Sequence, residues 1–251
     1  MWTHLIPATL EGKAMHNVQN AMFAASMAFS LGVSLDAIRQ GLRTFDTSFF
    51  QAPGRMNVYS EHPFKVILDY GHNAHAVGVM TDLIQRMDVA NRKVVVLAAP
   101  GDRRDEDILD IADVVTGKYD VYVLKRDDGL RGRDGDEVPR LLAERLKANG
   151  VPEAAIHVIP DEQQAIDAAL NMAEAGDLLL IFGDALARCW KQITKFNPDG
   201  EVANQIVVKK QVADSNAAMA AWLNQNEANY IPIEGITRDE RGIVIQPEQD
   251  D

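Results

Sequence analysis

Short apolar segments alternate with longer amphipathic segments between residues 65 and 196, and this alternation constrains the fold more than any other feature. The predicted strands are rich in Val, Ile and Leu and cover residues 65–70, 93–99, 119–125, 154–160 and 177–183. The predicted helices cover residues 76–87, 105–115, 136–148, 161–173 and 185–196, with Asp161 as the N-cap of the fourth. Because the strands are apolar on both faces, they predict an α/β domain with a mostly parallel sheet and helices on both faces. Ligand sites of such sheets lie in loops beyond the carboxyl ends of the strands.

Two further helices are predicted before the alternating region. Residues 13–31 are rich in Ala and Met and contain neither Pro nor Gly, which predicts a buried helix that ends at Gly32. Ser34 is expected to be the N-cap of a second helix over residues 34–45. Pro53 and Gly54 form a turn signal, which marks a plausible domain boundary.

The composition changes after Gly200. The remaining segment contains a strand candidate, a helix candidate and two halves of a predicted hairpin, at residues 205–210, 216–228, 229–235 and 242–247. We therefore divide the chain into residues 1–52, 53–200 and 201–251. The last of these is interpreted as a C-terminal extension.

Net charge excludes several classes of function. The chain has 251 residues, with 25 Lys and Arg against 37 Asp and Glu, and a formal charge of −12. Such a surface repels nucleic acid and anionic lipid, so neither is an expected partner. No apolar run approaches the roughly 20 residues of a membrane helix, and residues 1–30 lack a signal-peptide pattern. The single Cys189 excludes an internal disulfide and a Cys-based zinc site, so the cytoplasm is the expected compartment.

The first polar cluster follows the first strand of the alternating region. Asp69, His72, Asn73 and His75 crowd one strand-to-helix loop, and Gly71 permits a sharp turn there. A carboxylate at this place can accept a ribose hydroxyl, and an imidazole can pack on a ligand. The alternative is a helix N-cap with solvated His side chains, and both interpretations stay open.

The second cluster follows the next strand, at residues 99–107. Gly101 permits close backbone approach, and Asp102 can cap a helix. Arg103 and Arg104 offer forked donors for a phosphate or a carboxylate. The alternative, slightly favoured by residue type alone, is a capped helix with Arg–Asp ion pairs.

The third and fourth clusters lie farther apart in the chain. Residues 125–137 combine several Arg and Asp with three Gly, which is typical of a loop that recognises a charged substrate. Composition alone favours a solvated surface loop instead. His16, Asn17 and Asn20 share one face of the first helix. The two amides suit the edge of an adenine, and the alternative is polar packing at a domain interface.

Several common catalytic motifs are absent from the sequence. There is no G-x-x-x-x-G-K-[ST] motif, no G-x-G-x-x-G after the first strand, and no G-x-S-x-G. The His residues lack the H-E-x-x-H spacing of a zinc helix. Cys189 lies in an apolar helix, which favours a core position over a nucleophile.

Taken together, the segments resemble the Mur ligases. HNVQN followed by AMFAA resembles the helix that closes their central ATPase domain, PGRM the linker, and LDYGHN the motif opening their C-terminal domain. The finer resemblance is to the cyanophycin synthetase branch, through PGDRRDED, DDGLRGR, ARCWKQI and RDERGI. The resemblance implies a Rossmann-like Mur ligase C-terminal domain, preceded by two helices of a truncated central domain.

The resemblance also implies a reaction. Mur-type ligases phosphorylate a carboxylate with ATP, and an amine attacks the acyl phosphate to form an amide. Cyanophycin synthetases add Arg to the β-carboxylate of a poly-aspartate backbone in this way. The expected partners are therefore ATP, arginine or another amino acid, and an aspartate-containing peptide.

Roles carry over residue by residue. On the nucleotide side, Asn17 and Asn20 would approach the adenine, Arg55 the phosphates and Asp69 the ribose, with His72 and Asn73 beside the nucleotide. On the amino-acid side, the resemblance implies Asp102, Arg103, Arg104, Asp127, Asp128, Arg131 and Arg133. Arg131 and Arg133 would meet the substrate carboxylate, and Asp127 and Asp128 a guanidinium.

Two departures from the family pattern modify this expectation. Ala74 replaces the Pro of the motif after the first strand, so that loop loses one conformational restraint. The family's P-loop and magnesium ligands precede the helix at residues 13–31. We therefore expect ATP and Mg to serve a complete ligase, no metal ligands here, and little turnover by this chain alone.

Three hypotheses follow. In the first, the chain is the C-terminal ligase module of an enzyme of the cyanophycin synthetase branch, present as a fragment or as a split subunit that works with an upstream ligase subunit. Alternatively, it is a non-catalytic protein that binds a nucleotide or amino acid in a regulatory role. A different Mur-type ligase, of the muramyl or folylpolyglutamate kind, is less well supported by RGR and RCWKQ. In each case an uncovered helix at residues 13–31 would favour self-association or a partner.

Overall fold

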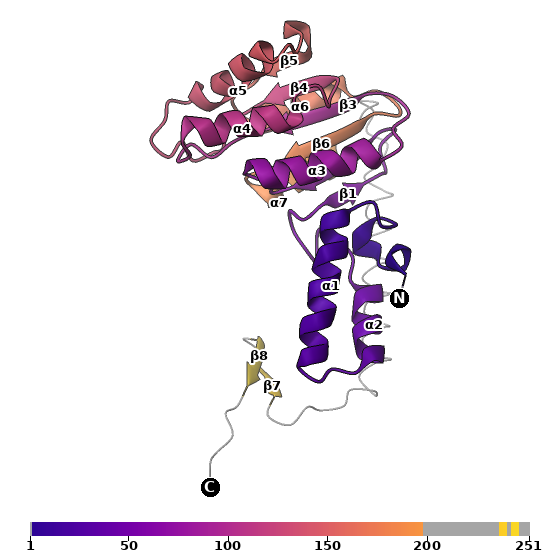
Figure 1. Cartoon of the computed structure of the whole chain (residues 1–251). Helices are drawn as coiled ribbons and strands as arrows, with labels where there is room; N and C mark the ends of the chain where they lie inside the picture. Colours follow the sequence, from indigo (N-terminus) through magenta and orange to yellow (C-terminus); the bar gives the residue numbers. More distant parts are fainter. Residues whose placement is uncertain (1, 198–235, 240–241, 246–251) are drawn as a thin grey trace. The chain divides into compact units, whose positions relative to one another are not determined.

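The computed structural model describes residues 2–197, 236–239 and 242–245, and it has two units, residues 1–198 and 199–251 (Figure 1). In the second unit, β7 (Ile236–Asp239) pairs antiparallel with β8 (Gly242–Ile245). Strand β8 lies within residues 242–247, the predicted second half of the hairpin. Its partner strand in the structure is β7, at residues 236–239. The strand candidates at 205–210 and 229–235 and the helix candidate at 216–228 lie outside the described residues. The division of the chain at residues 52 and 200 stays a prediction.

A six-stranded, mostly parallel sheet forms the centre of the first unit. Its strands are β1 (Asn57–Tyr59), β2 (Lys65–Asp69), β3 (Lys93–Leu97), β4 (Val121–Leu124), β5 (Ile156–Val158) and β6 (Leu178–Phe182). The order is β1-β2-β6-β3-β4-β5, and only β1 runs antiparallel to its neighbour. The predicted parallel sheet is confirmed. The three-residue edge strand β1 was not predicted, because a segment that short carries no pattern of its own.

Within residues 2–197, seven α-helices precede, separate and follow the strands of this sheet. They are α1 (Met15–Ser30), α2 (Leu35–Thr44), α3 (Ala74–Arg86), α4 (Asp105–Val115), α5 (Glu137–Ala148), α6 (Glu162–Met172) and α7 (Leu186–Lys195). Three short 3₁₀ turns lie at Thr3–Leu5, Pro7–Thr9 and Glu153–Ala155. The predicted caps are confirmed, because Ser34 Oγ accepts from the Ala37 amide and Asp161 Oδ1 from the Gln164 amide. None of these described helices is long and apolar enough to span a membrane.

Helices cover both faces of the sheet, as its apolar strands require (Figure 1). Successive side chains of a strand point to opposite faces. In β2, Ile67 therefore packs in one core cluster with apolar side chains of α3, α4 and α5, while Leu68 packs with α6 and α7. Cys189 is fully buried in this second cluster, as the sequence predicted. Burial of each large aliphatic side chain contributes roughly 1.5–3 kcal/mol to folding.

Helix α1 corrects one expectation. The sequence predicted a buried helix, yet no residue of α1 is buried. Its large apolar side chains are mostly in solvent, with Phe23 67% and Met27 62% exposed. The prediction was wrong because an apolar composition indicates only that a helix is suited to burial. In the described part of the chain, no other element covers these side chains. We call the exposed side chains of Met22, Phe23, Met27 and Phe29 the α1 apolar face.

Candidate functional site at the carboxyl edge of the sheet

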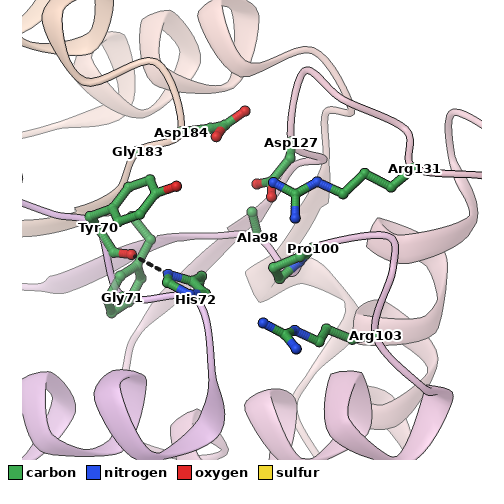
Figure 2. A pocket seen from close by; sticks show the side chains of 11 residues that line it. Tyr70, Gly71, His72, Ala98, Pro100, Arg103, Asp127, Arg131, Gly183 and Asp184 are labelled. Atoms are coloured by element: carbon green, nitrogen blue, oxygen red, sulfur yellow. Dashed lines mark hydrogen bonds between the residues drawn. The ribbon is translucent and has the colours of Figure 1, made fainter.

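A pocket lies where the loops after β2, β3, β4 and β6 meet (Figure 2). It is lined by Tyr70, Gly71, His72, Ala98, Pro100, Arg103, Asp127, Arg131, Phe182, Gly183 and Asp184. These strands are parallel neighbours, so their carboxyl ends lie along one edge. The structure thus brings the first three polar clusters of the sequence to one place. Four of the predicted site residues line the pocket: His72, Arg103, Asp127 and Arg131.

Asp69 organises the loop beside the pocket but does not line it. Its carboxylate is only 8% exposed, and it accepts hydrogen bonds from the Gly71 amide at 2.8 Å and the Met56 amide at 2.9 Å. Met56 adopts a left-handed backbone conformation with φ of 53°, which this bond helps to hold. Burial raises the pKa of Asp69, and these two amides oppose the rise. The ribose contact inferred for Asp69 stays a prediction.

Three neighbours of Asp69 complete this side of the site. The Arg55 guanidinium carbon lies 5.9 Å from the ring centroid of Tyr70, within cation–π range. His72 Nδ1 lies 3.0 Å from the Tyr70 carbonyl oxygen, with a role that depends on the tautomer. Asn73 Oδ1 accepts from the Ala76 amide at 2.9 Å and caps α3. For Asn73 the structure therefore shows the helix-cap alternative.

The cationic part of the pocket comes from Arg103 and Arg131. Arg131 Nη1 donates to both carboxylate oxygens of Asp102, at 3.2 and 3.3 Å, across the two loops. Asp102 therefore does not cap α4, whose N-cap residue makes no side-chain cap. The Arg103 side chain makes no hydrogen bond within the described residues, so its donors remain available to a ligand.

The other two arginines predicted to contact the amino acid, Arg104 and Arg133, bond to residues of the loops and of helices α4 and α5. Arg133 donates to the Gly101 and Arg103 carbonyls at 2.9 and 2.7 Å, and it pairs with Asp105 and Glu137. It therefore holds the loop after β3 against the loop after β4. Arg104 pairs with residues of its own helix, Glu106 and Asp107. Neither Arg104 nor Arg133 lines the pocket, and their substrate contacts stay predictions.

Gly101 allows the two loops to approach closely. A Cβ atom at this position would come within 2.3 Å of the Leu130 carbonyl oxygen. No side chain tolerates such a distance to backbone, so the walls of the pocket depend on this glycine. The sequence had indicated a close backbone approach here without naming the partner.

The acidic part of the pocket comes from Asp127 and Asp184. Burial raises the pKa of Asp127, the charge of Lys125 opposes this rise, and the charge of Asp184 adds to it. The Asp128 amide donates to Asp184 Oδ2 at 3.0 Å, and the Asp128 carboxylate turns to Arg188 at 2.7 Å. Asp128 is thus engaged beside the pocket rather than in its lining. Asp184 was missed by sequence reasoning, although it directly follows a predicted strand that ends at Gly183.

The predicted adenine contacts on α1 lie outside the pocket lining. Asn17 Nδ2 donates to the Ala8 carbonyl at 2.7 Å, and Asn20 Nδ2 donates to Asn17 Oδ1 at 3.2 Å. Burial lowers the pKa of the adjacent His16, and the nearby Asp69 charge opposes this shift. The start of α1 therefore lies close to the loop after β2.

The residues present do not provide a metal site. Within residues 2–197 and the two short strands, no group of three His, Cys, Asp or Glu side chains is arranged to hold a cation. No step involving magnesium is therefore derived from this chain.

Comparison with known proteins gives consistent relatives. The chain is 34% identical to the cyanophycin synthetase of Synechocystis sp. over 78% of its length, and 33% identical to that of Nostoc sp. over 90%. These matches span 22% and 24% of the relatives, so the chain covers under a quarter of their length. Among solved structures, E. coli FolC in complex with DHPP and ADP is 26% identical, with a TM-score of 0.51 over 64% of this chain and 35% of that chain.

A family model settles the classification. Residues 54–185, more than half of the chain, match the glutamate ligase domain of the Mur ligases. The matched range begins at Gly54 and ends directly after Asp184, so it contains every residue that lines the pocket. The chain therefore belongs to the Mur ligase family and carries its glutamate ligase domain.

Proposed function

We propose that the pocket binds the incoming amino acid of an ATP-dependent amide-forming ligase of the cyanophycin synthetase kind. The observation that carries this proposal is the charge arrangement in Figure 2. Asp127 and Asp184 lie in the upper part of the pocket and Arg103 in the lower part, while the Arg131 guanidinium lies between them, beside Asp127. A zwitterion with a cationic side chain, such as arginine, matches both ends. The amino acid's carboxylate would bind Arg103 and Arg131, and its guanidinium the two aspartates.

In this reaction class, ATP converts a carboxylate of an aspartate-containing peptide into an acyl phosphate. The amine of the bound amino acid attacks the acyl carbon, phosphate leaves with the bonding electrons, and the amine loses a proton. The side chains of this pocket would orient the amine and exclude competing orientations. Arg131 is held by Asp102, so its remaining donors are directed before the ligand arrives.

The nucleotide would bind beside this pocket. Arg55 is exposed next to Tyr70 and is free to reach a phosphate, while His72 lines the pocket edge. In this proposal Asp69 and Asn73 act mainly by fixing the loop that carries His72. Asn17 and Asn20 would approach the base from α1. The phosphate-binding loop and the Mg ligands would come from a segment or partner that supplies the missing G-x-x-x-x-G-K-[ST] motif.

Turnover would therefore need an upstream ligase subunit or segment. The test is reconstitution: the chain is mixed with the upstream portion of a related ligase, and release of ADP is measured with and without arginine. Arginine-dependent release in the mixture, and none from either part alone, is the expected outcome. If no pairing releases ADP, the split-ligase function is wrong.

A second candidate function takes these 251 residues as they stand, with the pocket and without a G-x-x-x-x-G-K-[ST] motif. A domain that keeps the pocket without the P-loop would serve as a nucleotide- or amino-acid-binding regulator. Calorimetry separates the two. A ligase module that holds only part of the nucleotide site should bind ATP weakly when isolated. Micromolar ATP affinity of the 251-residue chain would instead favour the regulator.

The α1 apolar face is the expected contact for the upstream partner or for a second copy of the chain. Replacing Phe23 and Phe29 with Ser should reduce self-association in sedimentation velocity without lowering the unfolding temperature. The matched control is Ser26→Ala on the same helix. Unchanged self-association in the double variant would exclude this face as the contact between two copies of the chain.

A further inference from the structure

A buried charge cluster lies outside the pocket, behind its acidic wall. It consists of Lys125 at the end of β4, Glu162 at the start of α6 and Arg188 on α7. The side chains of Lys125 and Glu162 are fully buried, and their charged atoms are 3.0 Å apart. The proposed function assigns no role to these three residues. Lys125 belongs to the third polar cluster of the sequence and Arg188 to the ARCWKQI segment, but no sequence pattern joins either of them to Glu162.

Glu162 is the centre of this cluster. Oε1 accepts from the Asp184 amide at 2.7 Å, and Oε2 accepts from the Ala185 amide at 3.3 Å and from Arg188 at 2.5 Å. Lys125 adds its charge on the other side. One carboxylate from α6 therefore fixes the backbone of the loop that carries Asp184.

The same cluster also fixes the loop after β4. Arg188 Nη2 contacts Glu162 and, at 2.7 Å, the Asp128 carboxylate. The Asp128 amide donates back to Asp184 Oδ2 at 3.0 Å. The contacts form a closed ring from Glu162 through Arg188 and Asp128 to Asp184 and back to Glu162.

The ring of contacts opposes the electrostatic repulsion between the two aspartates of the pocket. Asp127 and Asp184 carry charges of the same sign on one wall, and like charges in a poorly solvated place repel each other. Without a ligand, repulsion and solvation would move the two loops apart. For stability alone, apolar side chains would serve at least as well as a buried ion pair. A buried charge cluster that costs desolvation free energy and contacts both loops therefore indicates a role in positioning those loops.

We propose that Glu162, with Lys125 and Arg188, is a positioning group that holds Asp127 and Asp184 at a spacing selective for a cationic amino-acid side chain. This inference rests on the proposed function for its ligand, but not for its structural part. Glu162 touches no substrate in this scheme and acts through the two loops. It therefore sets the preference for charge in the side chain rather than the affinity for the common backbone of amino acids.

The test uses the variant Glu162→Gln in the full chain. Gln is nearly isosteric with Glu, but it loses the charge and turns amide hydrogens toward Arg188 or Lys125. The control is Asp161→Asn, which removes a charge at the neighbouring position and keeps a residue able to cap α6. Arg188→Met is a second variant, which cuts the bond to Asp128 but leaves the buried Lys125–Glu162 pair balanced.

The first readout is amide hydrogen exchange measured by NMR. In Glu162→Gln, exchange of the Asp128 and Asp184 amides should rise about tenfold, the effect of losing one charged hydrogen bond. The amides of Arg92 and Glu174, which bond to Asp177 at the opposite edge, should stay unchanged. In Arg188→Met, only the Asp128 amide should respond. Unchanged exchange at Asp128 and Asp184 in the variants would overturn the inference.

The second readout compares L-arginine with L-citrulline, its neutral isostere, in NMR titrations. Wild type should prefer arginine, and both variants should lose about tenfold in arginine affinity while citrulline changes little. Equal losses for both ligands would indicate a merely structural role and overturn the inference. If wild type shows no preference for arginine, the proposed function fails, and hydrogen exchange still decides the positioning role. Should Glu162→Gln not fold, Arg188→Met decides both readouts.

Discussion

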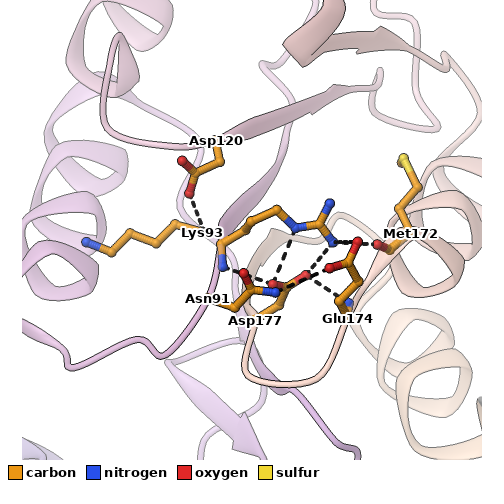
Figure 3. Close-up of polar contacts among 7 residues, drawn as sticks. Asn91, Lys93, Asp120, Met172, Glu174 and Asp177 are labelled. Carbon is orange, nitrogen blue, oxygen red and sulfur yellow. Dashed lines mark hydrogen bonds and ion pairs between the residues drawn. The ribbon is translucent and has the colours of Figure 1, made fainter.

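Acidic side chains at the amino edge of the sheet and those that line the pocket differ in how many hydrogen bonds they accept within the fold. At the amino edge, the Asp177 side chain is fully buried and accepts from the Arg92 amide and Nη2 and from the Glu174 amide, at 2.7–2.9 Å (Figure 3). At the carboxyl edge, Asp127 accepts no hydrogen bond from the described residues. The Asp184 carboxylate accepts one hydrogen bond from the described residues, from the Asp128 amide. The acceptors at the amino edge are used up within the fold, while those at the pocket remain available to a ligand.

The pKa values follow the same division. Burial by itself would raise the pKa of Asp177, but the Arg92 guanidinium and two amides lower it below its usual value. Burial raises the pKa of Asp127, and the charges of Lys125 and Arg131 offset only part of this rise. A carboxylate whose acceptors are all hydrogen-bonded thus stabilises the folded chain. A carboxylate without such partners costs stability until a cation binds to it. This contrast distinguishes a structural cluster from a binding site within one sheet.

Asp177→Ala should remove the hydrogen-bonded cluster at the amino edge and cause the largest loss of stability. It leaves Arg92 and two amides without their acceptor, so the free energy of unfolding should fall by about 3 kcal/mol. Urea unfolding followed by circular dichroism measures this loss. Arginine titration of the remaining folded molecules should give the wild-type affinity. A loss of arginine affinity as large as the loss of stability would erase the distinction between the edges.

Acid titration should show a smaller loss at the carboxyl edge. Burial opposes ionisation of Glu162, but Lys125, the Asp184 amide and Arg188 lower its pKa to about 2, from 4.5. Its contribution is therefore complete above pH 4.5 and disappears as the pH falls towards 2. Asp127 has a raised pKa, so its protonation acts in the opposite direction.

The measurement is urea unfolding of wild type and Glu162→Gln at pH 7, 4.5 and 3. The difference in unfolding free energy should be on the order of 2 kcal/mol at neutral pH and should shrink with acid. Asp161→Asn, which leaves the buried cluster intact, should track wild type. A difference that grows with acid would mean that Glu162 is not the stabilised carboxylate.

Gly101→Ala tests the contact between the loops that form the pocket. The added methyl group would meet the Leu130 carbonyl, so the loops must separate at a cost of about 1.5 kcal/mol. Arginine affinity should fall as well, because Arg103 and Arg131 lie on the two separated loops. Gly117→Ala offers a contrast: its Cβ would have open space, although its positive φ costs some strain. Retained arginine affinity in Gly101→Ala would show that loop contact does not shape the pocket.

Arg131→Ala should have the smallest effect on stability. Its side chain is exposed, and its one ion pair within the described residues is with exposed Asp102, so the free energy of unfolding should change by less than about 0.5 kcal/mol. Arginine use in a reconstituted ligase should weaken about tenfold, and more than ATP use. Steady-state kinetics with each substrate varied in turn measures both. Equal losses for arginine and ATP would contradict the carboxylate role.

Most secondary structure could be predicted because its signals are local. Apolar runs of six or seven residues, helical spacing and the caps Ser34 and Asp161 predicted the strands and helices to within a few residues. Three polar clusters could be placed at one edge, because parallel strands end together. The edge strand β1 was missed, since its three residues become a strand only by pairing with β2.

The sequence by itself determined the α/β class, the parallel strands and the chemistry of the loops that follow them. Only the tertiary structure decided that β6 lies between β2 and β3, which brings Asp184 to the pocket. It also separated the arginines that line the pocket from Arg133, whose donors bond to neighbouring loops. The physical reason is that the residue type determines which hydrogen bonds and ion pairs a side chain is able to form. Whether those bonds are made within the fold depends on segments far apart in the chain.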